Sequence, residues 1–314
     1  MRRKVLVCAL TLAASGVAVT HWLPPSLGVP DLPASVLPDQ APTRNARQAA
    51  QGQAAAPLGP IRRFDRTRLA EVVRSYLARR PGKAGIMVSD LRTGTSFGVS
   101  EHIRIVTASI VKVDILAGLL LQRQGEKRRL SGGERALASE MIRLSDNNAA
   151  DALYAAAGNG AGVTRANKRL GLKETVPYPN VWGASRTSPA DQVRLMNALV
   201  SPKSPLNATN RRYILGLMGA VIGEQRWGIS AAARPGDQVA IKNGWVPLHL
   251  QGTGWAVNSI GRITGPDHDF LVAVCSQGHP SMESGVATVE HVADLVVSAM
   301  RRVSPTGRET RPPR

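Results

Sequence analysis

One serine and one lysine stand three residues apart in the mostly apolar stretch TASIVKVDI, residues 107–115. On a helix, this spacing places Ser109 and Lys112 on one face within one turn. A neutral lysine can accept the serine proton when burial or a nearby positive charge lowers its pKa, and the serine then becomes a nucleophile. The alternative is a serine that bonds a helix carbonyl and a lysine that extends to the surface. The pair alone does not decide between the two interpretations.

Two further polar motifs occur once each and favour catalysis. Ser-Asp-Asn at 145–147 lies in an expected helical region, where amphipathicity requires no polar triplet. Lys-Asn-Gly at 242–244 stands at the end of an expected strand. The chance that all three motifs coincide in this order and in these settings is on the order of one per cent or less.

With these motifs, residues 65–303 resemble the penicillin-recognising serine hydrolases, in particular the class A β-lactamase family. The resemblance implies an α/β fold of the α+β kind, with an antiparallel sheet flanked by helices and an inserted all-helical domain. It places the site in the cleft between them. By the same analogy, Ser109 is the acyl-forming nucleophile, Lys112 accepts its proton, and Ser145 passes a proton to the leaving nitrogen.

The resemblance also implies substrate contacts. Asn147 would hold the substrate amide, and Lys242 would supply positive potential for the substrate carboxylate and for Ser145. The backbone N–H groups of Ser109 and of Trp245, which follows Gly244, would form the oxyanion hole. Asn243 stands where relatives have Thr or Ser, and it can donate a hydrogen bond with a different reach.

The loop GLKETVPYPNVWGASRTSPAD, residues 171–191, departs from the family pattern. It lacks the Glu-x-x-x-Asn segment whose glutamate activates the deacylating water in efficient β-lactamases. Glu174 is its only glutamate and falls too early, so we expect a solvated loop charge. Without a general base, deacylation is expected to be slow.

Two other segments bear on the cleft. The insertion WVPLHLQGTGW, residues 245–255, should reshape the cleft edge. No arginine starts the following strand, where many relatives keep one for the substrate carboxylate. Arg226 is either its substitute or an ordinary surface residue, and the sequence leaves both open.

Apolar periodicity and turn residues predict the elements that position these motifs. We expect a first helix after Asp65, a hairpin over 83–101, a helix ending at Gly125 and one or two helices over 131–158. The stretch 157–162 reads as a loop, and 188–200 as a helix. Three antiparallel strands over 237–278 and a helix over 282–303 complete the domain, so strands come from both ends of the chain and helices from the middle.

The first 22 residues have a basic start and an apolar run, which predicts a signal peptide or an N-terminal anchor. The protein is then secreted or extracytoplasmic, and touches a membrane only through this segment if it is uncleaved. Residues 23–62 predict a Pro/Ala-rich linker, 63–303 the hydrolase domain and 304–314 a basic disordered tail. Only Cys275 would remain after cleavage, so no intramolecular disulfide is expected.

The formal net charge of +18 implies an anionic environment, and a cell-wall polymer would satisfy it. Nucleic acid is not favoured, because only 4% of residues are aromatic and no recognition signature occurs. The six histidines are scattered, and the sequence has no His-Glu-x-x-His motif and no Cys cluster, so we expect neither a metal nor a cofactor.

The leading hypothesis is an exported serine hydrolase that forms an acyl-enzyme with β-lactams or related peptide amides and deacylates slowly. One alternative is a D,D-carboxypeptidase or esterase that acts on cell-wall peptides. Another is a non-catalytic module that binds the cell wall and has kept the fold.

Overall fold

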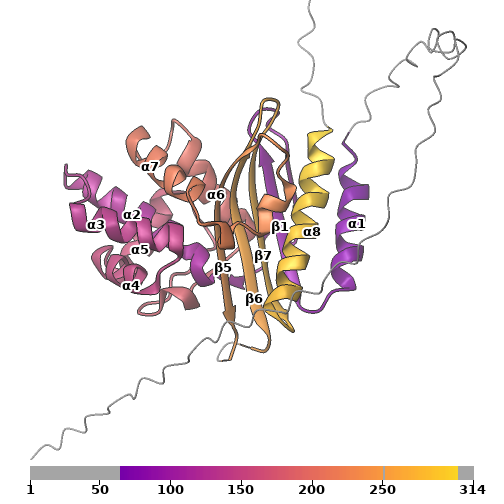
Figure 1. The fold of residues 1–314 in the computed structure, drawn as a ribbon, viewed down its shortest axis with the longest axis horizontal. Coiled ribbons are helices and arrows are strands. Elements are labelled where there is room, and N and C mark those ends of the chain that lie inside the picture. Colours follow the sequence, from indigo (N-terminus) through magenta and orange to yellow (C-terminus); the bar gives the residue numbers. More distant parts are fainter. Residues whose placement is uncertain (1–63, 250–251, 303–314) are drawn as a thin grey trace, which may run out of the picture. The chain divides into compact units, whose positions relative to one another are not determined.

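The computed structural model describes residues 64–249 and 252–302. The predicted leader and linker, and the tail from residue 304, lie outside these ranges. Five strands form one antiparallel sheet in the order β2-β1-β7-β6-β5. Their bounds are β1 (Lys83–Asp90), β2 (Ser96–Val99), β5 (Gln238–Pro247), β6 (Trp255–Thr264) and β7 (Asp269–His279). Helices α1 (Arg66–Ala78) and α8 (Met282–Arg301) cover one face, which confirms the predicted arrangement (Figure 1).

The sheet separates two hydrophobic cores. Alternate residues of β7 point to opposite faces, so Phe270 and Val272 pack beneath α1 and α8, whereas Leu271 and Ala273 join the core of the helical region. Since both faces are covered, β6 and β7 are buried along almost their whole length. Cys275 is a free, buried cysteine on β7.

The inserted helical region lies on the other face of the sheet (Figure 1). It contains α2 (Lys112–Gly125), α3 (Gly132–Ser139), α4 (Asn147–Ala156), α5 (Asn159–Arg169), α6 (Pro189–Val200) and α7 (Ala208–Gly219). Helix α2 is buried on almost every side, which explains its near-continuous apolar sequence. A short two-stranded sheet, β3 (Ile105–Val106) with β4 (Arg186–Thr187), joins the segment before α2 to the segment before α6.

Three local predictions differ from the structure. The expected loop at 157–162 is largely the start of α5, because Gly158 adopts a left-handed conformation with φ 85° and lets the chain turn directly into the helix. Strand β5 continues to Pro247, so the Lys-Asn-Gly motif lies within the strand and not at its end. Helix α7 was not predicted, although Asn207 caps it.

Within residues 64–249 and 252–302, no helix combines the length and apolar character needed to cross a membrane.

Candidate active site

Ser109 lies on the 3-10 turn η2 (Ala108–Val111) that leads into α2. Ala108, directly before it, has φ 45°, a left-handed conformation that is uncommon for a residue with a side chain. Strained backbone of this kind is concentrated at functional sites. Ser109 lines a cavity of about 690 Å³, together with Asn147, Trp182 and Trp245.

Lys112 is fully buried at the start of α2. Its Nζ lies 2.6 Å from the Ser145 carbonyl oxygen, 2.9 Å from Asn147 Oδ1 and 3.2 Å from Ser145 Oγ. Burial lowers the pKa of Lys112 to about 8, although the charges of Asp146 and Asp151 oppose this. A neutral amine has two N–H groups, and the two carbonyl oxygens can accept both, which leaves the nitrogen lone pair available to accept a proton.

The Ser-Asp-Asn motif marks a break between two helices. Ser145 has φ 60° and ends the π-helical turn Glu140–Leu144. The Asp146 side chain accepts a hydrogen bond from the Ala149 backbone N–H at 2.7 Å and caps α4. The polar triplet is therefore the point at which α4 begins. The break between the two helices directs Ser145 toward Lys112.

Lys242 on β5 is also fully buried. Its Nζ donates to Ser145 Oγ at 2.9 Å and to the Asn243 carbonyl oxygen at 2.8 Å. Burial, and then the charge of Lys112, lower the pKa of Lys242 well below its usual value. Ser145 Oγ thus lies between two lysine nitrogens, and the structure brings four predicted site residues, Lys112, Ser145, Asn147 and Lys242, into one hydrogen-bonded network.

Gly244 allows β5 to approach the turn that carries Ser109. A Cβ atom at this position would lie 2.7 Å from the backbone nitrogens of Ser109 and Ile110, which is closer than real Cβ atoms come. Trp245 follows, lines the cavity and packs edge-on against Trp227 with ring centroids 5.7 Å apart. The predicted oxyanion residues Ser109 and Trp245 therefore lie on two adjoining segments.

The Asn243 side chain differs from its predicted role as a substrate contact. It is 1% exposed, and its amide nitrogen donates to the backbone oxygens of Gln225 and Trp227, both at 2.8 Å. Asn243 does not line the cavity. Since both of its N–H groups are used in this way, the side chain holds segment 225–227 against β5.

Residues 245–249 of the inserted segment line the cavity. Arg226 does not line it, and its Nη1 donates to the Gly219 carbonyl oxygen at 3.2 Å. The structure thus favours Arg226 as an ordinary surface residue over Arg226 as the substitute for the arginine that binds the substrate carboxylate. Among the described residues that line this cavity, none is a lysine or an arginine.

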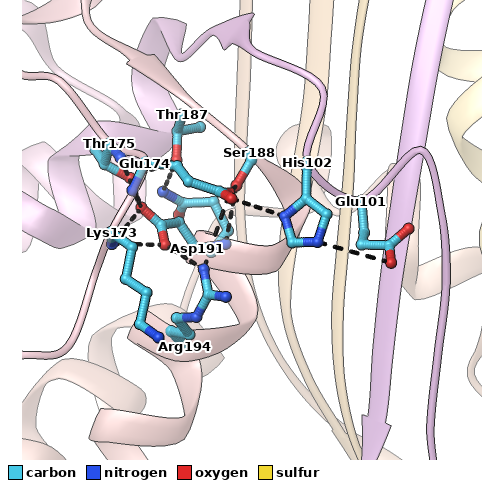
Figure 2. Close-up of polar contacts among 10 residues, drawn as sticks. Glu101, His102, Lys173, Glu174, Thr175, Thr187, Ser188, Asp191 and Arg194 are labelled. Atoms are coloured by element: carbon cyan, nitrogen blue, oxygen red, sulfur yellow. Dashed lines mark hydrogen bonds and ion pairs between the residues drawn. The ribbon is translucent and has the colours of Figure 1, made fainter.

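Loop 171–188 is tied to α6 through Asp191 (Figure 2). The buried Asp191 carboxylate accepts hydrogen bonds from the backbone N–H groups of Lys173, Glu174 and Thr175, at 2.6 to 3.1 Å, and pairs with Arg194 at 2.6 Å. Burial by itself would raise the pKa of Asp191, but these hydrogen bonds lower it overall.

Glu174 was expected to be solvated, and the structure corrects this. Its carboxylate accepts a hydrogen bond from Ser188 Oγ and lies 2.7 Å from His102 Nδ1 (Figure 2). Its side chain is 22% exposed and does not line the cavity with Ser109. Glu174 is thus a member of the polar cluster at the base of the loop.

Trp182 and Asp151 are among the cavity residues that were not identified from the sequence. The Trp182 indole N–H donates to Asp151 Oδ1 at 2.6 Å, and the indole face lies 4.6 Å from Lys112 Nζ. Asp151 stands four residues after Asn147 on α4, so the helical repeat could have placed it on the same face. No local signal indicates Trp182, because a loop carries it to the site.

Within the described ranges, no group of three or more His, Cys, Asp or Glu residues could hold a metal ion.

Several proteins of known sequence or structure are similar to this chain. The relative named "Putative lipoprotein LppW", from Mycobacterium tuberculosis and Mycobacterium bovis, is 26% identical over 230 residues, which cover 71% of this chain and 70% of the relative. The structure of PBP-A matches with a TM-score of 0.65 and 21% identity, over 76% of this chain and 97% of that one.

Two β-lactamase structures are similar in the same way. The TLA-1 extended-spectrum β-lactamase has a TM-score of 0.68 and 19% identity, over 75% of this chain and 99% of that one. A class A β-lactamase representative from Bacteroides cellulosilyticus has a TM-score of 0.67 and 15% identity, over 77% and 100%. At these identities, the structures confirm the predicted fold.

The family itself is established by sequence. A model of the family described as the Beta-lactamase enzyme family matches residues 67–135 and 132–300, well over half of the chain. These matched residues include all three motifs and both lysines of the buried network. The chain therefore belongs to the Beta-lactamase enzyme family.

Proposed function

We propose that the protein is an extracytoplasmic serine hydrolase that forms an acyl-enzyme on Ser109 with β-lactams or related peptide amides. The observation that carries the proposal is the network of two buried lysines around Ser145, beside a cavity that Ser109 lines. Burial lowers the pKa of Lys112 to about 8, so roughly a tenth of this amine is neutral at pH 7 and can act as a base.

In the proposed acylation, Ser109 Oγ attacks the amide carbonyl carbon and its proton moves to Lys112 Nζ. The backbone N–H groups of Ser109 and Trp245 stabilise the negative charge on the carbonyl oxygen. The carbon–nitrogen bond then breaks, and Ser145 gives its proton to the leaving nitrogen. Ser145 regains a proton from Lys112, whose Nζ lies 3.2 Å from its hydroxyl oxygen. Lys242, on the other side of that oxygen, stabilises the charge that develops on it.

Slow release of the acyl group is part of the proposal. Hydrolysis of the ester needs a base beside an attacking water. Glu174, the only glutamate of loop 171–191, is engaged with Ser188 and His102 outside the cavity. We therefore propose that acylation is faster than deacylation.

Similar proteins support the substrate class and the location. One solved structure similar to this chain is an acyl-enzyme complex of a PBP-A mutant with penicillin-G, at 20% identity. The curated relative carries the word lipoprotein in its name, which agrees with the signal or anchor pattern of residues 1–22.

The test combines a chromogenic cephalosporin with intact-protein mass spectrometry. The expected result is a stoichiometric adduct on the wild-type chain, slow chromophore release and no adduct on Ser109→Ala. Absence of both adduct and turnover in folded protein would overturn the proposal. Parallel incubation with a peptide that ends in D-Ala-D-Ala examines the alternative, in which Ser109-dependent release of D-alanine outpaces β-lactam turnover.

A further inference from the structure

The Trp182 indole packs against Lys112 Nζ, next to the polar network. Three oxygen atoms, two on Ser145 and one on Asn147, lie within 3.2 Å of this nitrogen. The indole face lies 4.6 Å away from the same nitrogen. An aromatic face attracts an ammonium group but cannot accept a proton from water, so it closes the site without adding a base.

The loop that carries Trp182 is fixed on several sides. The Thr107 backbone N–H, two residues before Ser109, donates to the Ser185 carbonyl oxygen at 2.8 Å. The Ser185 hydroxyl accepts from the Tyr178 N–H at 2.9 Å, and the Pro179 carbonyl oxygen accepts from the Gly160 N–H at 3.2 Å. These bonds hold the short turn that begins at Trp182 at a set position relative to Ser109.

Asp151 fixes the orientation of the ring itself. Its Oδ1 accepts the indole N–H at 2.6 Å, and it projects from α4 one turn after Asn147. The edge of the indole ring is thereby bonded to α4, and the face of the ring is turned to Lys112. The carboxylate and the indole both line the cavity with Ser109.

We propose that Trp182, oriented by Asp151, is a positioning residue that keeps water away from Lys112 and from the ester bond on Ser109, and so prolongs the acyl-enzyme. The inference rests on the proposed function. In hydrolysis, a water oxygen must bond to the ester carbonyl carbon while a base takes its proton, and the bond from that carbon to Ser109 Oγ then breaks, with the proton returned to Ser109. Lys112 could serve as that base, but the indole stands where the water would have to approach it.

The test compares Trp182→Ala, Trp182→Phe and Asp151→Ala with the wild-type full chain. A penicillin is added, the excess is removed, and the adduct is followed by intact-protein mass spectrometry. We expect the acyl-enzyme lifetime of Trp182→Ala to shorten by about tenfold or more, because water and the Lys112 amine can then meet. Trp182→Phe keeps an aromatic face without the N–H, so its acyl-enzyme lifetime should lie between those of the wild type and Trp182→Ala. The lifetime of Asp151→Ala should also lie between these two.

A second readout separates positioning from general damage. Removal of the indole admits water to Lys112, so the pH at which acylation reaches half its maximum should move above about 8 in Trp182→Ala. Val176→Ala is the matched control, because Val176 lies in the same loop, is 56% exposed and does not line the cavity. It should leave the lifetime and the pH profile unchanged.

The outcomes are distinguishable. Adducts of equal lifetime on the wild-type chain, Trp182→Phe and Asp151→Ala would overturn the inference and leave the proposed function standing. No adduct on the wild-type chain would overturn both. If Trp182→Ala fails to fold, the other two variants decide the question by themselves.

Discussion

At the scale of single residues, the site depends on how two buried amines share one hydroxyl. Lys112 and Lys242 are both fully buried, and Ser145 Oγ lies 3.2 Å from one nitrogen and 2.9 Å from the other. Burial disfavours charge on each amine, and their mutual repulsion disfavours it further on Lys242. With a pKa of about 8, roughly a tenth of Lys112 is neutral at pH 7, far more than for an exposed lysine, and this fraction can accept the serine proton.

This arrangement predicts a pH dependence of acylation. The pKa of Lys112 is about 8, so the neutral amine increases with pH and acylation should be half-maximal near pH 8. Below that pH, the rate should fall by about tenfold per pH unit. Stopped-flow absorbance or quenched mass spectrometry, from acid to alkaline pH, measures this acylation rate.

Lys112→Arg provides the comparison for this profile. Arginine stays protonated in proteins, so the variant should lose acylation by on the order of a hundredfold or more at every pH. A flat wild-type profile, or an active Lys112→Arg enzyme, would contradict the role of Lys112 as the base.

At the scale of elements, loop 171–188 is built on a carboxylate from the next helix. Asp191 accepts three backbone N–H groups of the loop before α6 has completed its first turn. These N–H groups belong to a segment outside any helix or strand. The Asp191 carboxylate accepts the hydrogen bonds that a neighbouring strand would otherwise accept. The far end of the loop is fixed by β4, which pairs with β3 two residues before the turn that carries Ser109.

Asp191→Ala should therefore destabilise the protein markedly. The substitution leaves three backbone donors and the Arg194 guanidinium without their acceptor, so the free energy of unfolding should fall by about 3 kcal/mol. Urea denaturation followed by circular dichroism measures the change. Glu174→Gln is the control, because its partly exposed carboxylate should contribute less than about 1 kcal/mol. Equal stability of the two variants would argue against Asp191 as the anchor.

The sequence predicted most of the elements well because they depend on local pattern, and the motif residues could be proposed for the same reason. Ser109, Lys112 and Ser145 are conspicuous as polar groups in apolar stretches, and the strands and helices around them follow short periodicities. The start of α5 was missed because Gly158 and Gly162 resemble a loop in composition, although one supplies a left-handed cap and the other a close approach to Ala157.

What the sequence could not predict depends on distant contacts. Trp182, Glu174 and Asn243 are each positioned by residues from other elements, and no neighbouring residue indicates which way their side chains turn. The sequence identified the absence of a suitably placed glutamate in the loop. It could not show that an indole covers Lys112 at this side of the cavity.

At the scale of the whole molecule, a buried carboxyl group links two helices of the inserted region. Asp114 on α2 is fully buried, and its Oδ1 accepts from Asn167 Nδ2 of α5 at 3.1 Å. Asp114 Oδ2, Asn167 Oδ1 and Gln192 Oε1 of α6 have no partner among the described residues. A protonated carboxyl can donate to one of these oxygens, whereas a carboxylate can donate to none.

The contribution of Asp114 to stability should therefore fall as pH rises. Burial raises the pKa of Asp114 from 3.8 to about 7, and Asp191 adds to this, whereas the bond from Asn167 opposes it. The folded chain holds this proton more tightly than the unfolded chain does, so the stabilisation is complete below pH of about 4 and is lost by about 7. Its size is on the order of 4 kcal/mol.

Denaturant unfolding at pH 5 and pH 8 measures this dependence. In Asp114→Asn, which keeps a donor at every pH, the contribution of this group should disappear and the variant should be more stable than wild type at the higher pH. The exposed Glu71→Gln variant should keep the wild-type difference. An equal difference between pH 5 and pH 8 in Asp114→Asn and in the wild type would show that Asp114 makes no such contribution.

The division of β7 between two cores has a consequence for how this fold can change. Phe270, Val272 and Val274 face one core, and Leu271, Ala273 and Cys275 face the other, so a slip of one residue would exchange every side chain between the two layers. Both layers would then be wrong at once, since neither face is open to solvent. An insertion or deletion of one residue in this strand would therefore disrupt both cores. Selection must preserve the alternation of side chains between the two faces as well as their hydrophobicity.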